Sequence, residues 1–178
     1  MRSWRIVLIS ALALVTVGCS SAEKPAAAPK PSPTKAVTLK EPCAVLAGDA
    51  VGKAIERQSV TGAPGPDQNT AANGGKAKTC VYSAEGKQVG ALAVTRYDGN
   101  KVKPDAMIAS IKEKKPGSRD VPGIAEGALY YVEEAKTATL VAAKVVGGVP
   151  ILVSYSGPAK MTPEQMTPLV KQAIDAES

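Results

Sequence analysis

Few of the 178 residues have side chains suited to catalysis, metal binding or covalent modification, and the three cysteines are the most informative of them. The sequence contains no histidine, the residue on which general acid–base and nucleophilic catalysis most often depend. Without histidine, a pair of cysteines could complete a zinc site only with carboxylates. Glu133 and Glu134 are adjacent, and neighbours on a strand point to opposite faces. We therefore predict no catalytic residue, no metal site and no cofactor.

Cys19 stands at the end of a hydrophobic N-terminal run. Arg2 and Arg5 precede an apolar stretch from Ile6 to Val17, which is typical of a secretory signal peptide and too short for a membrane span of about 20 residues. The segment VTVGC, ending at Cys19, resembles the lipobox of bacterial lipoproteins, whose cysteine is acylated and becomes the mature N-terminus. The resemblance implies a signal peptide over 1–18 and a palmitate-type lipid anchor that holds Cys19 at the extracytoplasmic face of the cell membrane. The alternative is a soluble secreted protein, in which an unpaired thiol would be unusual.

Residues 19–40 are predicted to form a disordered tether. They are rich in proline, alanine and lysine and contain almost nothing large and apolar, so they cannot offset the entropy of ordering. Ser21 and Lys24 match the Ser-x-x-Lys spacing of some acyl-transfer enzymes, but a disordered tether offers them no preorganised surroundings. The predicted role of the tether is spacing, over about 25 Å as a coil and up to about 65 Å when extended.

The net charge of +6 lies mostly outside the predicted domain at 41–178, which holds 16 basic and 15 acidic residues. Nucleic-acid binding would also use aromatic side chains as stacking platforms, and this region contains neither tryptophan nor phenylalanine. We therefore exclude nucleic acid as a partner. The tether lysines lie beside the membrane, where each adds about 1 kcal/mol of attraction to anionic headgroups.

Cys43 and Cys80 remain as an even pair in an exported chain. Such a pair is typical of a disulfide, because the compartment is oxidising. Closing a loop of about 38 residues would stabilise the fold by about 3.9 kcal/mol in the chain-entropy description. We predict that this bond ties the first helix of the domain to its first strand.

Hydrophobic periodicity and turn residues predict the elements that surround this bond. Short helical segments are expected over 41–46 and 49–57, followed by a long polar loop from Thr61 to Ala77. A hairpin turning at Glu85–Gly86 joins strands over 78–84 and 88–98, with Val89, Ala91, Ala93, Thr95 and Tyr97 on one face. Pro104–Asp105 begins a helix that Pro116–Gly117 ends.

The second half of the chain predicts three antiparallel strands over 123–134, 136–148 and 149–157, the last two joined at Gly147–Gly148. Thr162 and Gln165 form a capping box at the start of a C-terminal helix, in which Pro168 is expected to delay the start or kink the first turn. The predicted fold is a single α+β domain, with about five antiparallel strands and helices packed on one face.

Two cysteine-containing segments are distinctive. EPCAVLAGDAVGKAI contains Pro42–Cys43, and KTCVYSAEG contains Cys80 with Tyr82 two positions later. Together with VPGIAEGALYYV, these segments resemble the actinobacterial lipoproteins grouped as domain of unknown function 3558. That family pairs a Pro-Cys near the tether with a later cysteine that an aromatic residue follows, commonly tryptophan where this chain has Tyr82. The resemblance implies a cell-envelope lipoprotein with a conserved disulfide, and it supplies no activity.

Two functions from different classes fit the sequence better than an enzyme does. The first is a non-catalytic binding module that meets an envelope protein through its surface, with the loop from Thr61 to Ala77 as the favoured contact. The second is a carrier that holds a lipid or another small apolar ligand between sheet and helices, because alanine, valine and glycine dominate the strands. An envelope hydrolase without a recognisable motif is the third alternative. The five tyrosines could line a binding face or lie half-buried with their hydroxyls at the rim.

Overall fold

A computed structural model describes residues 38–70 and 74–178. Cys19, the signal peptide and most of the tether lie outside the described residues. The helices are α1 (Pro42–Val45), α2 (Gly48–Ile55), α3 (Pro104–Lys114) and α4 (Pro163–Ala176). The strands are β1 (Thr61–Pro64), β2 (Gln68–Thr70), β3 (Gly75–Ala84), β4 (Lys87–Tyr97), β5 (Arg119–Asp120), β6 (Gly127–Glu133), β7 (Thr137–Val146) and β8 (Val149–Pro158).

The strands of the described part form one antiparallel sheet. Seven of them follow the order β1-β3-β4-β8-β7-β6-β5, and β2 pairs with β3 on the same edge as β1. The five strands expected from the sequence are β3, β4, β6, β7 and β8, which form the centre of this sheet. The single α+β domain is therefore confirmed, with a larger sheet than predicted.

The segment from Thr61 to Ala77 is not one long loop, and this prediction was wrong. Thr61–Pro64 pairs with Cys80–Ser83, and Gln68–Thr70 pairs with Gly75–Ala77, so both ends of the segment belong to the sheet. All four residues of β1 are exposed, so the strand shows no alternation of apolar and polar positions. Hydrophobic periodicity, which reports burial, could not reveal such an edge strand.

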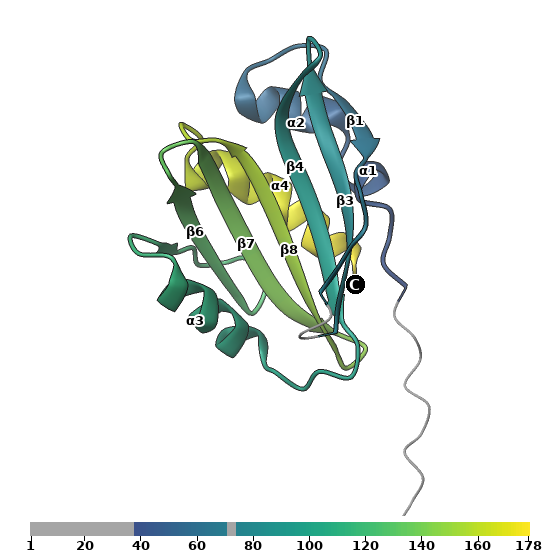
Figure 1. Cartoon of the computed structure of the whole chain (residues 1–178), viewed down its shortest axis with the longest axis vertical. Helices are drawn as coiled ribbons and strands as arrows, with labels where there is room; N and C mark the ends of the chain where they lie inside the picture. The colour runs from purple at the N-terminus through teal and green to yellow at the C-terminus, as the bar shows by residue number, and fades with distance from the viewer. Residues whose placement is uncertain (1–37, 71–73) are drawn as a thin grey trace, which may run out of the picture. The chain divides into compact units, whose positions relative to one another are not determined.

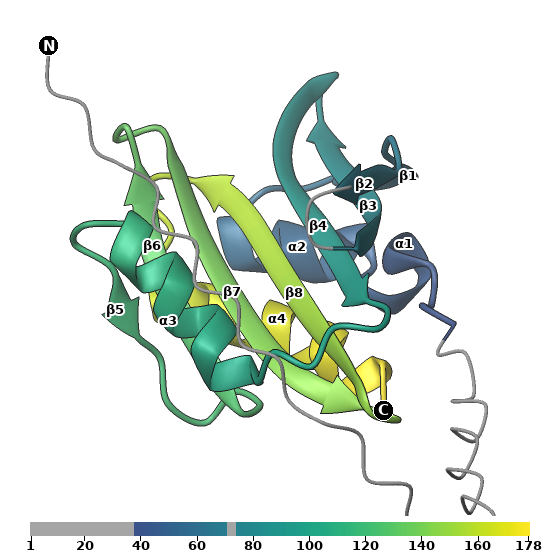
Figure 2. The same cartoon turned by 60° about the horizontal axis from the view of Figure 1, so that its bottom comes forward.

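Helices cover both faces of the sheet, not one face as predicted. α4 packs on β7 and β8, with α1 and α2 beside it, whereas α3 packs on the other face of β6, β7 and β8 (Figures 1 and 2). Ile108 of α3 is buried against Leu129, Val141 and Ala143. β7 is therefore buried on both sides, which explains its uninterrupted run of buried residues from Ala138 to Ala143.

The main core lies between the sheet and α1, α2 and α4. It is filled by large side chains that are almost inaccessible to solvent, among them Tyr82, Tyr155, Leu46, Leu92, Leu140, Met166 and Ile174. Leu39, which the sequence assigned to the tether, is 6 % exposed and belongs to this core. The folded part thus includes residues just ahead of Glu41.

α4 begins as the sequence predicts. The Thr162 side chain accepts a hydrogen bond from the Gln165 amide, and the Gln165 side chain accepts one from the Thr162 amide. Pro168 lies inside the helix and does not delay its start, which is at Pro163. Its ring is exposed, while Met166, Leu169, Val170, Ala173 and Ile174 form the buried stripe.

Candidate functional site

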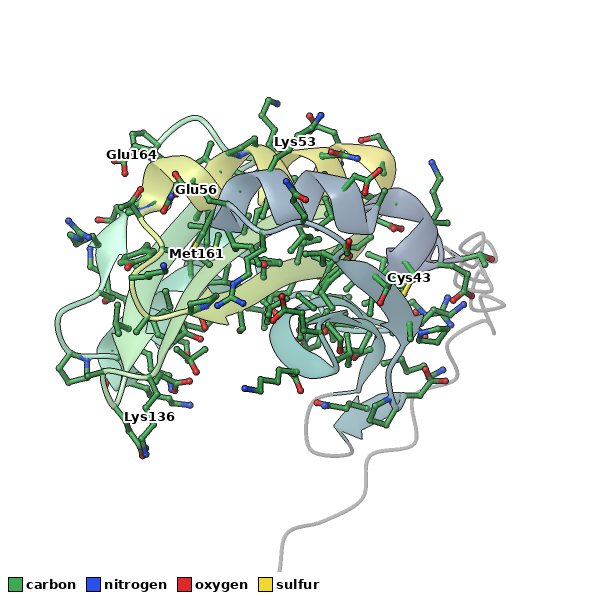
Figure 3. All side chains as sticks on the ribbon, turned by 90° about the horizontal axis from the view of Figure 1, so that it is seen from above. Cys43, Lys53, Glu56, Lys136, Met161 and Glu164 are labelled. Atoms are coloured by element: carbon green, nitrogen blue, oxygen red, sulfur yellow. A yellow bond between two sulfur atoms is a disulfide. The ribbon has the colours of Figure 1, made fainter. Side chains whose placement is uncertain are left out.

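Cys43 and Cys80 form a disulfide, as predicted, with their Cα atoms 5.1 Å apart. The bond links α1 to β3, and the sulfur of Cys43 appears beside α1 in Figure 3. Cys80 is fully buried, so the bond is part of the main core. The predicted lipidation site, Cys19, lies outside the described residues.

α1 packs against one face of β3 and β4, on the side of the main core. The candidate site is the opposite face of β3, β4 and β8. We call it the open face. Its members are in cross-strand register, they are all half-buried, and none is charged: Ala77, Thr79, Val81, Ala91, Ala93, Thr95, Tyr97, Ser154 and Ser156. The common orientation predicted along β4 is confirmed here for Ala91, Ala93, Thr95 and Tyr97. Val89 differs, because it packs against the main core beside a β-bulge at Tyr82–Ser83.

A polar cluster lies where the open face meets the end of α3, and the Ser156 hydroxyl of the open face belongs to it. The hydroxyls of Ser156 and Thr139 lie 2.9 Å apart, in hydrogen-bond contact. Lys115, just after α3, forms an ion pair with Glu133, and its Nζ lies 5.2 Å from the ring centroid of Tyr131. Burial, followed by the charge of Glu133, raises the pKa of Tyr131, whereas the hydrogen bond with Glu133 raises the pKa of Lys115. The cluster therefore holds Lys115 as a cation and Tyr131 as a neutral phenol.

The adjacent carboxylates do not act together. Glu133 ends β6 and contacts Lys115, while Glu134 lies in the following turn with a φ of 48° and pairs with Lys136 at 3.5 Å. Among the described residues, no group of three or more cysteine, aspartate and glutamate side chains is arranged to hold a metal ion. No helix in the described part of the chain is long and apolar enough to cross a membrane.

The five tyrosines divide between the two faces of the sheet. Tyr97 and Tyr131 are half-buried on the side of the open face, and Tyr82, Tyr130 and Tyr155 are buried on the main-core side. The Tyr82 hydroxyl donates to the Leu46 carbonyl at 2.7 Å, and that of Tyr130 donates to the Met161 carbonyl at 2.8 Å. The Tyr155 hydroxyl is buried and has no partner among the described residues. Burial raises the pKa of both Tyr82 and Tyr155, so both stay neutral.

Two surface hollows adjoin at the end of the sheet that carries the β6–β7 turn, and both are lined by Lys136 and Thr137. The first, of about 470 Å³, extends to Lys115 and Glu133. The second, of about 350 Å³, extends to Ser156 at the end of the open face. Figure 3 shows Lys136 at the outer tip of this turn, pointing away from the domain.

Sequence reasoning did not single out the open face or the buried Tyr155. The available signal was the run Ser154-Tyr155-Ser156-Gly157, in which small hydroxyl residues alternate with an aromatic residue along a strand. Such alternation assigns the serines to one face and Tyr155 to the other, but it does not say which face a helix covers. Comparisons of the chain with protein-family models, with curated proteins and with solved structures found no match.

Proposed function

We propose that this protein is a non-catalytic binding module of the bacterial cell envelope, anchored through a lipid on Cys19 at the outer face of the cytoplasmic membrane. The lipobox-like sequence around Cys19 supports the anchor. The disulfide between Cys43 and Cys80 supports an oxidising compartment, because such bonds persist there. The likeness to the lipoproteins of domain of unknown function 3558 rests on the same cysteines and remains part of the proposal.

The observation that carries the binding role is the open face. Its nine side chains are small or hydroxylic, uncharged and only half-buried, although they lie at the centre of a sheet whose opposite side is a packed core. Gly65 packs against Thr79 and Val81, and the Thr79 hydroxyl is buried, so β3 is partly covered on this side. A partner could approach the backbone of β4 and β8 most closely at Ala91, Ala93 and Ser156, where the side chains are small. The open face therefore replaces the segment from Thr61 to Ala77 as the proposed contact.

The carrier alternative has less support. The space between the sheet and α1, α2 and α4 holds Tyr82, Tyr155, Leu46 and Met166, and all four are essentially inaccessible to solvent. A lipid in that space would have to displace these side chains, at the cost of the packing that stabilises the domain. We therefore place the ligand on the surface.

Crosslinking in living cells tests this function. A photoreactive side chain at Ala93 of the open face should capture a specific partner, and the same group at the exposed Lys53 of α2 is the matched control. The capture should weaken when Cys19→Ala releases the protein from the membrane, because tethering raises the local concentration. Equal capture from both positions would contradict the placement. Turnover of a cell-wall or lipid substrate by the purified protein would contradict the non-catalytic role.

A further inference from the structure

Two exposed apolar side chains lie at one end of the sheet. Among the described residues, the exposed large apolar side chains are Val102, Val132 and Val145, each 42 % exposed. Val102 lies in the connection between β4 and α3, and Val145 lies just ahead of the β7–β8 turn. β4 and β8 are antiparallel, with Arg96 near the end of one strand paired with Ile151 near the start of the other. The connection and the turn therefore lie at the same end of the sheet, which we call the β7–β8 end.

The first described residues belong to the β7–β8 end as well. Lys144, near the end of β7, donates a hydrogen bond to the hydroxyl of Ser178. The neighbouring residue Glu177 accepts one from the backbone amide of Lys40. Figure 1 likewise shows the start of the described chain and the connection from β4 to α3 in the lower half of the domain. The predicted tether therefore enters the domain at the β7–β8 end.

The connection between β4 and α3 carries a surplus of positive charge. Its charged residues and their ion-pair partners are four cations and two carboxylates: Lys76, Arg96, Lys101, Lys103, Asp98 and Asp105. Asp98 pairs with Lys76 at 3.2 Å and with Arg96 at 3.3 Å. Lys101 and Lys103 are exposed on either side of the exposed valine, and neither forms an ion pair with a described residue. These two lysines can therefore meet an anionic surface without breaking a contact of the fold.

We propose that the β7–β8 end lies on the anionic phospholipid headgroups of the membrane, with Lys101 and Lys103 at the lipid phosphates and Val102 within the headgroup layer. Single exposed valines are common on protein surfaces, but this one stands between two unpaired cations at the end that the tether enters. Lysines are attracted to an anionic bilayer, and an apolar side chain adds the area that it buries. Val145 adds apolar area, whereas Glu126, which accepts a hydrogen bond from its amide, adds no attraction.

This docking rests on the lipid anchor proposed above and gives the proposed function an orientation. The predicted tether would span about 25 Å as a coil, so it keeps the domain near the bilayer. With the β7–β8 end on the membrane, the strands point away from the surface. The open face, which lies along β4 and β8, then stays accessible to a partner from the side.

Paramagnetic broadening of backbone amide resonances tests the docking. Cys19 is the one thiol that the disulfide leaves free, so residues 19–178 can be coupled through it to a maleimide lipid in nanodiscs with nitroxide-labelled headgroups. The resonances of Lys101, Val102 and Lys103 should lose more intensity in nanodiscs that contain phosphatidylglycerol than in nanodiscs of phosphatidylcholine, which give the baseline that the tether alone produces. The resonance of Lys136, at the opposite end of β7, should keep its intensity in both.

Vesicle binding by the secreted Cys19→Ala protein, with its disulfide intact, provides the second readout. Lys101→Gln combined with Lys103→Gln should lower the partition coefficient onto phosphatidylglycerol vesicles by about 25-fold, which is about fivefold for each lysine. Lys53→Gln combined with Lys87→Gln is the matched control. It removes the same charge from two exposed lysines near the β3–β4 turn at the opposite end, and it should change the coefficient by less than about twofold.

Equal broadening in the two kinds of nanodisc, or equal losses in the two double variants, would overturn the docking. Capture of a protein by a photoreactive group at Val102 in living cells, without the lipid-dependent broadening, would also overturn it and would assign this end to a protein partner. If the docking fails while crosslinking through Ala93 persists, the proposed function stands without this orientation. If crosslinking through Ala93 fails while the broadening is observed, the docking stands and the open face does not.

Discussion

Glu177 accepts a hydrogen bond of 3.3 Å from the backbone amide of Lys40, a residue 137 positions earlier in the chain. The carboxylate is buried, and its second oxygen has no partner among the described residues. Burial raises the pKa of Glu177 above its ordinary value of 4.5, although Lys40, Lys144 and Lys78 oppose this shift. The start and the end of the domain are thus joined through a carboxylate that is costly to keep ionised.

The raised pKa predicts a pH dependence of stability. The folded state holds the Glu177 proton more tightly than the unfolded chain does. Protonation of Glu177 therefore stabilises the fold fully below pH 4.5, and this stabilisation is lost as pH rises through the folded pKa. Glu177→Gln keeps an acceptor for the Lys40 amide without a charge. At neutral pH we expect it to match the parent or exceed it by up to about 1 kcal/mol in unfolding free energy.

Urea unfolding at a series of pH values measures this difference. Glu164→Gln is the control, because a hydrogen bond from Thr162 and a backbone hydrogen bond lower the pKa of Glu164, and its stability contribution is lost as pH falls. If Glu177→Gln is less stable than the parent at neutral pH, the attraction of the carboxylate to Lys40, Lys144 and Lys78 outweighs the desolvation cost of its burial.

Removing the disulfide should destabilise the domain by about 2–4 kcal/mol. The double variant Cys43→Ser, Cys80→Ser, made in a Cys19→Ala background, should unfold at a lower denaturant concentration than the Cys19→Ala protein. Iodoacetamide labelling of the unfolded, unreduced Cys19→Ala protein should detect no free thiol. Two labelled cysteines would show that the bond does not form.

The anchor is tested by Cys19→Ala alone. Two or three acyl chains should hold a protein stably where one chain is marginal, so the variant should move from the membrane pellet to the medium. Fractionation with an antibody against the folded domain provides the measurement. If the variant stays in the pellet, an uncleaved hydrophobic segment or a protein partner holds it there.

Neighbouring residues of β4 should respond differently to substitution. Leu92 is fully buried in the main core, so Leu92→Ala should cost about 2–5 kcal/mol of unfolding free energy. Ala93 is half-buried on the open face, and Ala93→Ser should change stability by less than about 0.5 kcal/mol. Comparable losses in the two variants would mean that the open face is covered in the folded protein.

The central strands and α4 could be predicted because burial leaves a period in their sequences, whereas α3 was predicted from Pro104–Asp105 and Pro116–Gly117 at its ends. β4 alternates strictly between Leu92 or Val94 and smaller residues, and the capping box at Thr162 marks the start of α4. β1 is exposed throughout and carries no such period. The sequence partly indicated that a helix covers the second face of the sheet. The run Ala138–Ala143 is typical of a strand that is buried on both sides.

The candidate site was harder to predict, because its features arise between strands that are far apart in the sequence. Gly90 and Gly157 become neighbours only when β4 pairs with β8, and neither residue alone indicates a hollow. The unpaired Tyr155 hydroxyl depends in the same way on what packs around it. Cys43 and Cys80, in contrast, were predictable as a pair, because two cysteines that follow a predicted signal peptide are typical of a disulfide.

The disulfide also sets how the domain bears mechanical load. A pulling force on the chain ahead of residue 38 first strains the packing of Leu39 and the contact between Lys40 and Glu177. Detachment of the chain then stops at the covalent bond of Cys43. From there the force passes through Cys80 into β3, which is held by the ladders to β1 and β4. Residues 44–79, including α2, β1 and β2, lie inside the closed loop, so the covalent path of the force bypasses them. A domain loaded in this way resists extraction through its sheet rather than through its first helix.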